Sequence, residues 1–436
     1  MMNLSNQPNT GGIMKKLFAL LMVSVIMGTM FAGCSKNEPT KEQTDSVDNT
    51  TTTDGSSETE TMTEVTNVTV WYYWEAEGHQ KTLNKVIDDF NTLQKGVSVE
   101  AKYVPFTDFK KQLSIGASAD ELPDIVILDN PDHAAYASMG IFADITGEFD
   151  VSNYYAGPVN SATIDGKLYG VPFGSNCLAL FYNDDMLQAA GVEVPTTWEE
   201  LEAVAAATTT DNVYGLAFSS LQNEEGTFNF LPWVWSTGAS SYEINSEGGI
   251  KALKFIKGLV DAGSMPVEAI NWTQGDTKNQ FISGNLAMMI NGTWQVPSMR
   301  SDVPDMNWNV AMIPQDKEQA SGLGGENFAV IAGGQEEASL EFLKYVTQPE
   351  VNLFMMNNMG YISPNMATAD GQFGDDSVYQ VFVDELEFAK SRGPLPEWPQ
   401  VSDAISLAFN EVIVDISSPE VAAEKAQKTI DSIIGQ

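Results

Sequence analysis

Cysteine and histidine are almost absent from this sequence of 436 residues. The chain has two cysteines, Cys34 and Cys177, and two histidines, His79 and His133. Cys34 belongs to the N-terminal signal described below, so Cys177 is left without a partner and no intramolecular disulfide is expected. Neither histidine sits in a metal-spaced cluster, and a lone histidine is more often structural than catalytic. P-loop, HExxH, GxSxG and CxxC motifs are missing too. We therefore expect no metal, no cofactor and no catalytic residue.

Basic residues are also scarce. Lysine and arginine total 22 against 59 aspartates and glutamates, which gives a formal net charge of −37. So negative a surface repels phosphate backbones, and nucleic acid is excluded as a partner. After Met30 no apolar run is long enough to cross a bilayer. Contact with a membrane is therefore expected only through an anchor.

The N-terminus has the layout of a secretory signal. Lys15 and Lys16 form a basic segment, an uncharged apolar stretch covers residues 17–30, and Phe31-Ala32-Gly33 precede Cys34. The apolar stretch is too short for a spanning helix. We expect a signal peptide at residues 1–33, with Met14 as the start. The segment resembles the lipobox of bacterial lipoproteins, which implies an acylated, palmitate-bearing Cys34 at the extracytoplasmic face of the cell membrane.

The segment after Cys34 changes in composition. Residues 34–66 are mostly Thr, Ser, Asp, Glu and Asn, including four consecutive threonines at 50–53. Such a segment cannot bury enough apolar surface to offset its ordering entropy. We interpret it as a solvated tether that holds a globular body away from the membrane. The remaining chain of about 370 residues can bury an ample core without disulfides, and its length indicates about two domains.

The body alternates between strand and helix patterns. Val68, Val70 and Tyr72 alternate with polar neighbours as in a half-buried strand, and the next apolar residues recur at helical spacing. Gly96 is the expected C-cap of that helix. Strand, helix, strand, helix and strand are expected in turn at residues 68–72, 83–93, 97–103, 108–119 and 124–128. This order predicts parallel pairing with right-handed crossovers.

The same alternation resumes later in the chain. A strand is expected at residues 177–182, and Thr197 with Glu200 forms a capping box for a helix through Ala207. The segment 421–434 has the pattern of an amphipathic helix. The sequence thus predicts an α/β fold with two lobes.

Aromatic residues stand out among the polar segments. Aromatic faces pack well against the C–H faces of sugar rings, while carboxylates and amides hydrogen-bond the hydroxyl groups. Each tryptophan taken singly is as well explained by a core position. The aromatic residues in loop-like surroundings are Trp74, Phe228, Phe230, Trp233, Trp235, Trp272, Trp294, Trp308 and Trp398.

Several short motifs, in order and spacing, resemble the family 1 extracellular solute-binding proteins, the maltose-binding-like group that serves ABC importers. The likeness covers nearly all of residues 67–436. It is carried by LPDI at 122–125, AY at 135–136, GIFADIT at 140–146, DGKLYGVP at 165–172, FYND at 181–184, PTTWEEL at 195–201, FISGNLAM at 281–288, NGTW at 291–294 and GGEN at 324–327.

The resemblance implies a periplasmic-binding-protein-like fold of type II. Two α/β lobes would be joined by a hinge and would hold a solute in the cleft between them. The implied lobe I comprises residues 67–174 and 324–372, and lobe II comprises residues 177–321 and 375–436. The resemblance further implies capture of a mono- or oligosaccharide, delivery to ABC transporter permease subunits, and a monomeric protein.

The resemblance also transfers site residues to this chain. A stacking tryptophan in an Asn-Gly-x-Trp turn maps onto Trp294, and a hinge-side polar contact maps onto Asn176. The maltose binder of the family has a carboxylate at the latter position, which counts against maltose as the ligand. The full set implied to bind ligand is Trp74, Glu75, Glu77, Asp129, Asn130, Asn176, Phe228, Trp233, Trp294, Glu326 and Asn327.

The residues before Trp294 predict a turn. Asn291-Gly292-Thr293 follows the apolar run 286–290, and Asn-Gly tolerates left-handed backbone geometry. We expect a tight turn of that kind to carry Trp294 clear of the strand and into the cleft.

Other functions remain open at this point. An aromatic and acidic cleft also suits a polyamine or another cation, through charge pairing and cation–π contact. A carbohydrate-active enzyme would use two carboxylates in such a cleft, but no pair can be chosen from the sequence. A sensor subunit that reports a solute to a kinase would carry the same signature as a transport protein.

Overall fold

The computed structural model describes residues 65–119 and 121–435. The signal peptide, Cys34 and nearly all of the tether therefore lie outside the described residues. The first strand begins at Thr66, one residue inside the expected tether. Within the described part of the chain, no helix combines the length and the apolar character that a membrane span requires.

The elements before the first long strand begin with the expected alternation of strand and helix, through residue 129, and continue with elements that were not expected. They are β1 (Thr66–Tyr72), α1 (Glu77–Leu93), β2 (Val97–Tyr103), α2 (Phe106–Ala119), β3 (Ile125–Asp129), α3 (His133–Ser138), α4 (Ala156–Ser161), β4 (Thr163–Ile164) and β5 (Lys167–Leu168).

The middle of the chain starts with that long strand. It contains β6 (Val171–Asn183), α5 (Asp184–Ala190), α6 (Trp198–Thr208), β7 (Tyr214–Ala217), α7 (Glu224–Ser236), α8 (Glu247–Asp261), α9 (Gln274–Ile282), β8 (Leu286–Gly292), α10 (Val296–Asp302) and β9 (Trp308–Ala311).

A second long strand opens the last part of the chain. The elements are β10 (Ser321–Val330), α11 (Glu336–Val346), α12 (Pro349–Met359), α13 (Met366–Ala369), α14 (Ser377–Leu386), β11 (Ala389–Ser391), α15 (Trp398–Ile413) and α16 (Pro419–Ile434). Short 3-10 turns lie at Asn130–Asp132, Val267–Asn271 and Thr293–Gln295.

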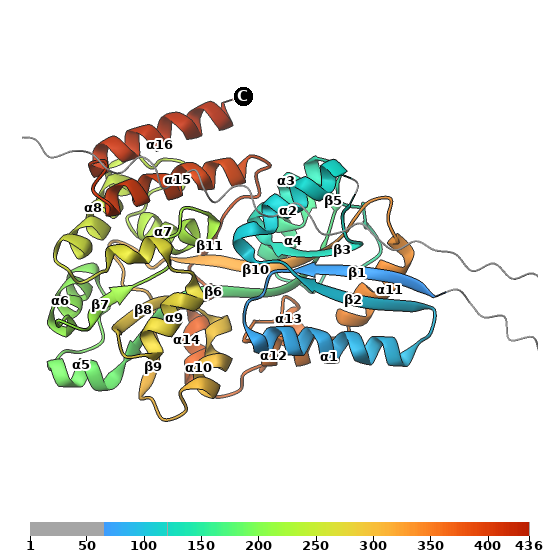
Figure 1. Ribbon diagram of the computed structural model, residues 1–436, viewed down its shortest axis with the longest axis horizontal. Coiled ribbons are helices and arrows are strands. Elements are labelled where there is room, and N and C mark those ends of the chain that lie inside the picture. Colours follow the sequence, from blue (N-terminus) through green and yellow to red (C-terminus); the bar gives the residue numbers. More distant parts are fainter. Residues whose placement is uncertain (1–64, 120, 436) are drawn as a thin grey trace, which may run out of the picture. The chain divides into compact units, whose positions relative to one another are not determined.

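The strands form a mixed sheet in the order β2-β1-β3-β10-β6-β8-β7, with β11 beside β10 and β9 beside β6. The expected parallel pairing is confirmed for β1 with β2 and with β3. The strands β6 and β10 instead run antiparallel to each other and to their neighbours β8 and β3. Figure 1 shows these two long strands lying side by side in the middle of the sheet.

Apolar residues are buried in four clusters, which we group into two cores according to the half of the sheet that they cover. Along β3 they alternate between the two faces of the sheet, as the period of a strand requires, with Ile125 and Ile127 on one face and Val126 and Leu128 on the other. The clusters on the two faces of β3, together with the apolar faces of α1 and α12, form what we call the first core. The second core comprises the cluster around β8, α7 and α15, which includes Trp233, and the cluster on the other face of β6 and β8, which includes Cys177 and Phe382.

The chain passes between the two cores more than once. Along β6, Phe173 belongs to the first core, while Cys177 and Leu178 belong to the second. Along β10 the order is reversed, since Ala320 just before the strand packs in the second core and Phe328 in the first. A third passage follows Tyr361. The chain thus has the expected α/β fold with two lobes.

Local signals explain most element ends. The capping box is confirmed, since the Glu200 backbone N–H donates to Thr197 Oγ1 at 3.2 Å and the Glu200 carboxylate accepts from the Thr197 N–H. The expected cap Gly96 is wrong, because α1 ends at Leu93 and Gln94 is the cap residue. Its side-chain oxygen accepts the N–H groups of Gly96 and Val97, which turns the chain without a left-handed glycine.

Cys177 and both histidines are buried. Cys177 is a buried free thiol whose Sγ donates to the Phe382 carbonyl, and burial raises the pKa of this thiol well above its ordinary value. Burial lowers the pKa of His79 to about 4 and that of His133 to about 3. Both imidazoles are therefore neutral near pH 7.

Candidate functional site

A cavity of about 580 Å³ opens beside the central strands and is lined by residues of both cores. Trp74, Asp129 and Glu326 come from the strands and strand ends of the first core. Phe228 of α7 and Arg392, directly after β11, come from the side of the second core. We call this cavity the cleft. Its position fits the rule that open α/β sheets bind ligands at strand ends, where the topology changes.

A buried carboxyl group, that of Glu326, is the polar centre of the cleft. Its Oε1 accepts hydrogen bonds from Tyr73 Oη at 3.0 Å, Trp74 Nε1 at 3.2 Å and Tyr361 Oη at 2.8 Å. Its Oε2 is buried and has no hydrogen-bond partner in the described part of the chain. Burial, and to a lesser degree the nearby Asp129, raises the pKa of Glu326 to about 7.

Strand register brings this carboxyl to Asp129. Glu326 of β10 pairs with Asp129 of β3 and with Gly174 of β6. The preceding Gly325 has φ +139, and a Cβ there would lie 2.2 Å from the Gly174 carbonyl oxygen. Only glycine fits this close approach of two strands, so the Gly-Gly motif positions Glu326 at the cleft.

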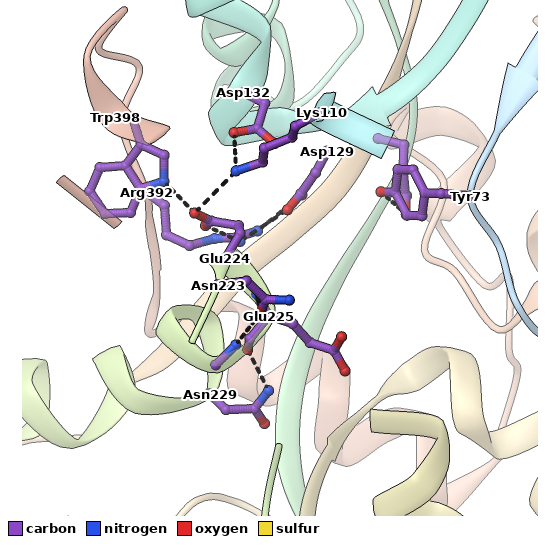
Figure 2. A network of polar contacts seen from close by, with 12 residues as sticks. Tyr73, Lys110, Asp129, Asp132, Asn223, Glu224, Glu225, Asn229, Arg392 and Trp398 are labelled. Atoms are coloured by element: carbon purple, nitrogen blue, oxygen red, sulfur yellow. Dashed lines mark hydrogen bonds and ion pairs between the residues drawn. The ribbon is translucent and has the colours of Figure 1, made fainter. Parts of the chain in front are cut away.

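A buried ionic network around Arg392 joins the two cores (Figure 2) and includes Asp129, which pairs with Glu326 across the β3–β10 register. The Arg392 guanidinium donates through both terminal nitrogens to the Asp129 carboxylate, at 3.1 Å each. It also donates to Glu224 Oε1 at 2.7 Å, while Trp398 Nε1 donates to Glu224 Oε2 at 3.0 Å. On the far side Lys110 pairs with Asp132 at 2.8 Å and lies 4.0 Å from Glu224.

The start of helix α7 places the network's carboxylate. Asn223 is the N-cap, and its side chain accepts the N–H groups of Glu225 and Gly226 at 3.0 and 3.3 Å. Glu224 and Glu225 thus occupy the first helical turn, where the helix dipole favours negative charge. Burial raises the pKa of Glu225 to about 7, although the Gln274 backbone N–H donates to this carboxyl.

Electrostatics hold Arg392 in place. Its side chain is 2% exposed, and its guanidinium lies 4.0 Å from the centroid of the Phe228 ring, a cation–π distance. Burial alone would lower the pKa of Arg392, but Asp129 and Glu224 outweigh it and raise the pKa. For Asp129 the burial prevails over Arg392 and raises the pKa of the carboxyl.

Trp294 and Phe228 form an aromatic wall of the cleft. Their ring centroids are 6.2 Å apart with an interplanar angle of 24°, an offset stack. The expected left-handed turn before Trp294 is wrong, because Gly292 is extended, with φ −109 and ψ 173, as the last residue of β8. Glycine is needed there for another reason. The indole covers the backbone, and a Cβ on Gly292 would lie 1.9 Å from Trp294 Cζ3.

Most of the residues implied by the resemblance line the cleft. They are Trp74, Glu75, Glu77, Asp129, Asn176, Phe228, Trp294 and Glu326. Asn176 lies at the passage of β6 between the cores, and its buried Oδ1 finds no hydrogen-bond partner among residues 65–119 and 121–435. Asp129 reaches the cleft with its carboxylate already bound by Arg392.

Three of the implied residues do not line the cleft. Trp233 is fully buried in the second core against Trp198 and Phe255. Phe228 and Trp233 were expected together, but residues 224–236 are a helix rather than a loop. Five residues of helix rotate a side chain by roughly 140°, so only one of the two faces the cleft.

Asn327 and Asn130 are buried behind the cleft wall. Asn327 follows Glu326 in β10, so its side chain points to the opposite face of the sheet. There its Nδ2 donates to Ser161 Oγ at 3.0 Å. Asn130 starts the 3-10 turn after β3 and is 7% exposed.

Sequence reasoning missed several cleft residues. They are Tyr73, Glu225, Gln274, Tyr361 and Arg392. One signal was available, because Arg300 and Arg392 are the only arginines in the sequence. An arginine that is buried in so acidic a chain is expected to be bound by a carboxylate. Nothing in the local pattern around Tyr361 or Gln274 distinguishes them from their neighbours.

The charges around the cleft are mostly paired. Lys81 pairs with Glu77 at 2.6 Å, and Lys278 pairs with Asp302 at 2.9 Å. With Arg392 bound to Asp129, the lining carboxyls outside these pairs are Glu75, Glu225 and Glu326. Burial raises the pKa of all three, to about 7 for the latter two. Among the described residues no group of three or more His, Cys, Asp or Glu side chains is arranged to hold a metal ion.

Comparison with known proteins identifies relatives that are described as binding proteins. Residues 85–378 match the family described as bacterial extracellular solute-binding protein. The chain is 23% identical over 355 residues to a lactose-binding protein of Rhizobium radiobacter, covering 73% of this chain and 82% of that protein. It is 22% identical over 372 residues to a galactooligosaccharide-binding protein of Bacillus subtilis, covering 79% and 86%.

Solved structures of other solute-binding proteins have the same fold as this chain. The GacH receptor of Streptomyces glaucescens, described unliganded and in complex with acarbose, superposes with a TM-score of 0.78 at 26% identity, covering 86% of this chain and 99% of that one. A solute-binding protein of Thermotoga lettingae bound with α-D-tagatose gives a TM-score of 0.79 at 24% identity, covering 85% and 100%.

Proposed function

Because this chain belongs to the bacterial extracellular solute-binding proteins, we propose that it captures a neutral mono- or oligosaccharide in the cleft and delivers it to an ABC transporter permease. The observation that carries the proposal is the make-up of the cleft. An aromatic wall of Trp294 and Phe228 stands beside the buried polar groups of Glu326 and Asn176. Aromatic rings pack on sugar C–H faces, and oriented polar atoms bind sugar hydroxyls. The sugar-binding relatives support the same solute class.

The charge state of the cleft favours a neutral ligand over a cation. A polyamine site would need ionised carboxylates free to pair with ammonium groups. Here Glu77 and Asp129 are already paired, and the raised pKa values of Glu225 and Glu326 leave these carboxyls partly protonated near neutral pH. Glu75 is the remaining unpaired carboxyl, and burial raises its pKa too. Neutral hydroxyl groups can hydrogen-bond the same carboxyl oxygens whether or not the carboxyl groups are ionised.

The lobes are proposed to close on the ligand. We assign lobe I to residues 67–174 and 324–372 and lobe II to residues 177–321 and 375–436, bounds supported by the points at which β6 and β10 pass between the two cores. A sugar that contacts Glu326 on one side and Trp294 on the other binds the closed arrangement more tightly, and so shifts the population toward it.

We further propose that the chain leaves its ligand unchanged. A glycosidase needs two carboxyl groups that flank a glycosidic bond, about 5–5.5 Å or 6.5–9.5 Å apart. The buried cleft carboxyls of Glu326 and Asp129 are held instead by three donors and by a bidentate arginine. The family and the binding-protein relatives support the same reading.

A ligand panel tests the proposed function. Lactose, galactooligosaccharides, maltotriose and D-tagatose would be compared with spermidine and with amino acids by thermal unfolding. We expect at least one neutral sugar to raise the melting temperature, because a ligand that binds only the native state stabilises it. At about one hundred times the dissociation constant the gain is about 2.7 kcal/mol. A salt-sensitive response to spermidine, with no response to any sugar, would contradict the proposal.

The anchor is a separate proposal. Cys34 is proposed to be acylated, so that the mature protein begins at this residue and stays at the extracytoplasmic face of the membrane through its tether. Stable anchoring takes two acyl chains, because a single one binds only marginally. In the native host, Cys34→Ala is expected to leave the protein unprocessed or to release it into the medium, as measured by fractionation and N-terminal mass spectrometry. Normal processing and membrane retention of the variant would rule the anchor out.

A further inference from the structure

A second pair of aromatic rings lines the cleft on the side of the first core. Tyr73 directly follows β1, and Phe106 is the first residue of α2, three residues after β2. Both side chains are only partly buried, and both line the cleft. Trp294, which is also partly buried, lines the same cleft after β8 of the second core. The cleft therefore has aromatic surface on two sides.

Tyr73 and Phe106 are held in place by their neighbours. The Tyr73 ring packs edge to face with Phe106 and with Phe109, at centroid distances of 4.9 and 5.4 Å. Phe109 is buried in the first core, and Tyr73 Oη donates to Glu326 Oε1 at 3.0 Å. Rings that are fixed in this way lose little side-chain freedom when a ligand covers them, which lowers the entropic cost of binding.

The two aromatic sites belong to strands that are far apart in the sheet. Three strands, β3, β10 and β6, lie between β1 and β8. Neighbouring strands are about 4.8 Å apart, so β1 and β8 are separated by about 19 Å along the sheet. The Trp294 indole stays over Gly292 of its own strand, and the Phe106 ring stays beside Tyr73. One sugar ring stacked between two aromatic rings would hold them only about 9–14 Å apart, twice the spacing of a stacked pair.

The cleft also has room for more than one sugar ring. Its volume is about 580 Å³. A hexose has a dozen non-hydrogen atoms, and these occupy at most about 360 Å³ if each takes the roughly 30 Å³ of a water molecule in the liquid. The lining continues to polar side chains of α9 and α10, among them Lys278, Ser298 and Ser301. Hydroxyl groups of further rings would find hydrogen-bond partners there.

We propose that Phe106, supported by Tyr73, is a second stacking site, and that the solute is an oligosaccharide whose rings cover Phe106 and Trp294 at the same time. This inference rests on the proposed function and narrows its ligand to a sugar of two or more rings. Phe106 belongs to the proposed lobe I and Trp294 to the proposed lobe II. An oligosaccharide therefore meets aromatic surface on both lobes and favours their closed arrangement, whereas a monosaccharide covers only one of the two rings.

The chain length of the sugar tests the inference in the wild-type protein. Isothermal titration calorimetry would compare lactose, galactooligosaccharides and maltotriose with D-galactose, D-glucose and D-tagatose. We expect at least one of the oligosaccharides to bind at least about tenfold more tightly than any of the monosaccharides, because a single ring forgoes one stacking contact. A monosaccharide that binds within tenfold of the tightest oligosaccharide would overturn the inference while the sugar-binding function stands.

Phe106→Ala tests the second stacking site itself. We expect the affinity for the tightest oligosaccharide to fall at least about tenfold, or about 1.4 kcal/mol. Phe106→Tyr keeps the flat ring and should bind like wild type, whereas Phe106→Leu keeps an apolar side chain without a flat face and should share the loss. Phe354→Ala is the matched control, because Phe354 of α12 is 38% exposed in the same lobe but does not line the cleft. It should leave the affinity unchanged.

The variants also separate stacking from packing. Wild-type affinity in Phe106→Ala would show that the ring does not touch the ligand. Wild-type affinity in Phe106→Leu, or an equal loss in Phe106→Tyr and Phe106→Ala, would show that this side chain only fills space. Each of these results would overturn the inference and leave the sugar-binding function intact. If the wild-type protein binds none of the sugars, the proposed function fails, and the inference fails with it.

Discussion

Replacing Glu224 by alanine is expected to lower the free energy of unfolding by about 3–5 kcal/mol. The carboxylate is 1% exposed and binds Arg392 and Trp398 at once, while Lys110 lies 4.0 Å away. Removing one partner of a buried ion pair leaves the other charge without compensation in the interior, which is the costly case. Because the network joins the two cores, we expect the loss to lower the stability of both lobes together.

Glu318→Ala is the matched control for this prediction. Glu318 pairs with Lys390, two residues before Arg392, at 2.7 Å, but both side chains are about half exposed. Exposed pairs contribute about 0–1 kcal/mol because water and salt screen them. Urea unfolding followed by tryptophan fluorescence and by far-UV circular dichroism measures both variants. Equal effects of the two substitutions would show that the buried network adds nothing to stability.

Replacing Trp294 by alanine is expected to weaken sugar binding at least tenfold, about 1.4 kcal/mol. Its ring is part of the wall of the cleft, stacked on Phe228, and only partly buried. Loss of the ring removes apolar surface that would cover the sugar. We expect the ligand-free protein to keep nearly its full stability, as thermal unfolding would show, with the affinity measured by titration calorimetry.

Trp233→Ala is expected to give the opposite result. Trp233 is fully buried and packs on Trp198 and Phe255, away from the cleft. Its loss should cost about 3–5 kcal/mol of stability, as for other buried aromatic residues. The fraction that remains folded should bind sugar normally. If Trp294→Ala instead unfolds the protein while its folded fraction binds normally, the assignment of Trp294 to the ligand is wrong.

The proposed binding residues followed from the sequence to different extents. Trp294 and Glu326 lie in short motifs, NGTW and GGEN, in which glycine allows a close approach of backbone or ring. The resemblance of these motifs to those of the solute-binding family is what placed both residues at the cleft, and the close approaches were seen only in the structure. Trp233 was misplaced because the position on a helix, not the distance along the chain, decides which side chain shares a face with Phe228.

Local properties of the sequence by themselves determined the order of strands and helices around β1 to β3, the capping box of Thr197 and Glu200, and the α/β class. Periodicity records which face of an element is buried, and a cap is settled within four residues. Only the tertiary structure decided which groups meet. Tyr73 bonds Glu326 across 253 positions, and Arg392 bonds Asp129 across 263. Contacts over such distances depend on how β6 and β10 return the chain between the two cores, and no local pattern records the partner that a side chain will find there.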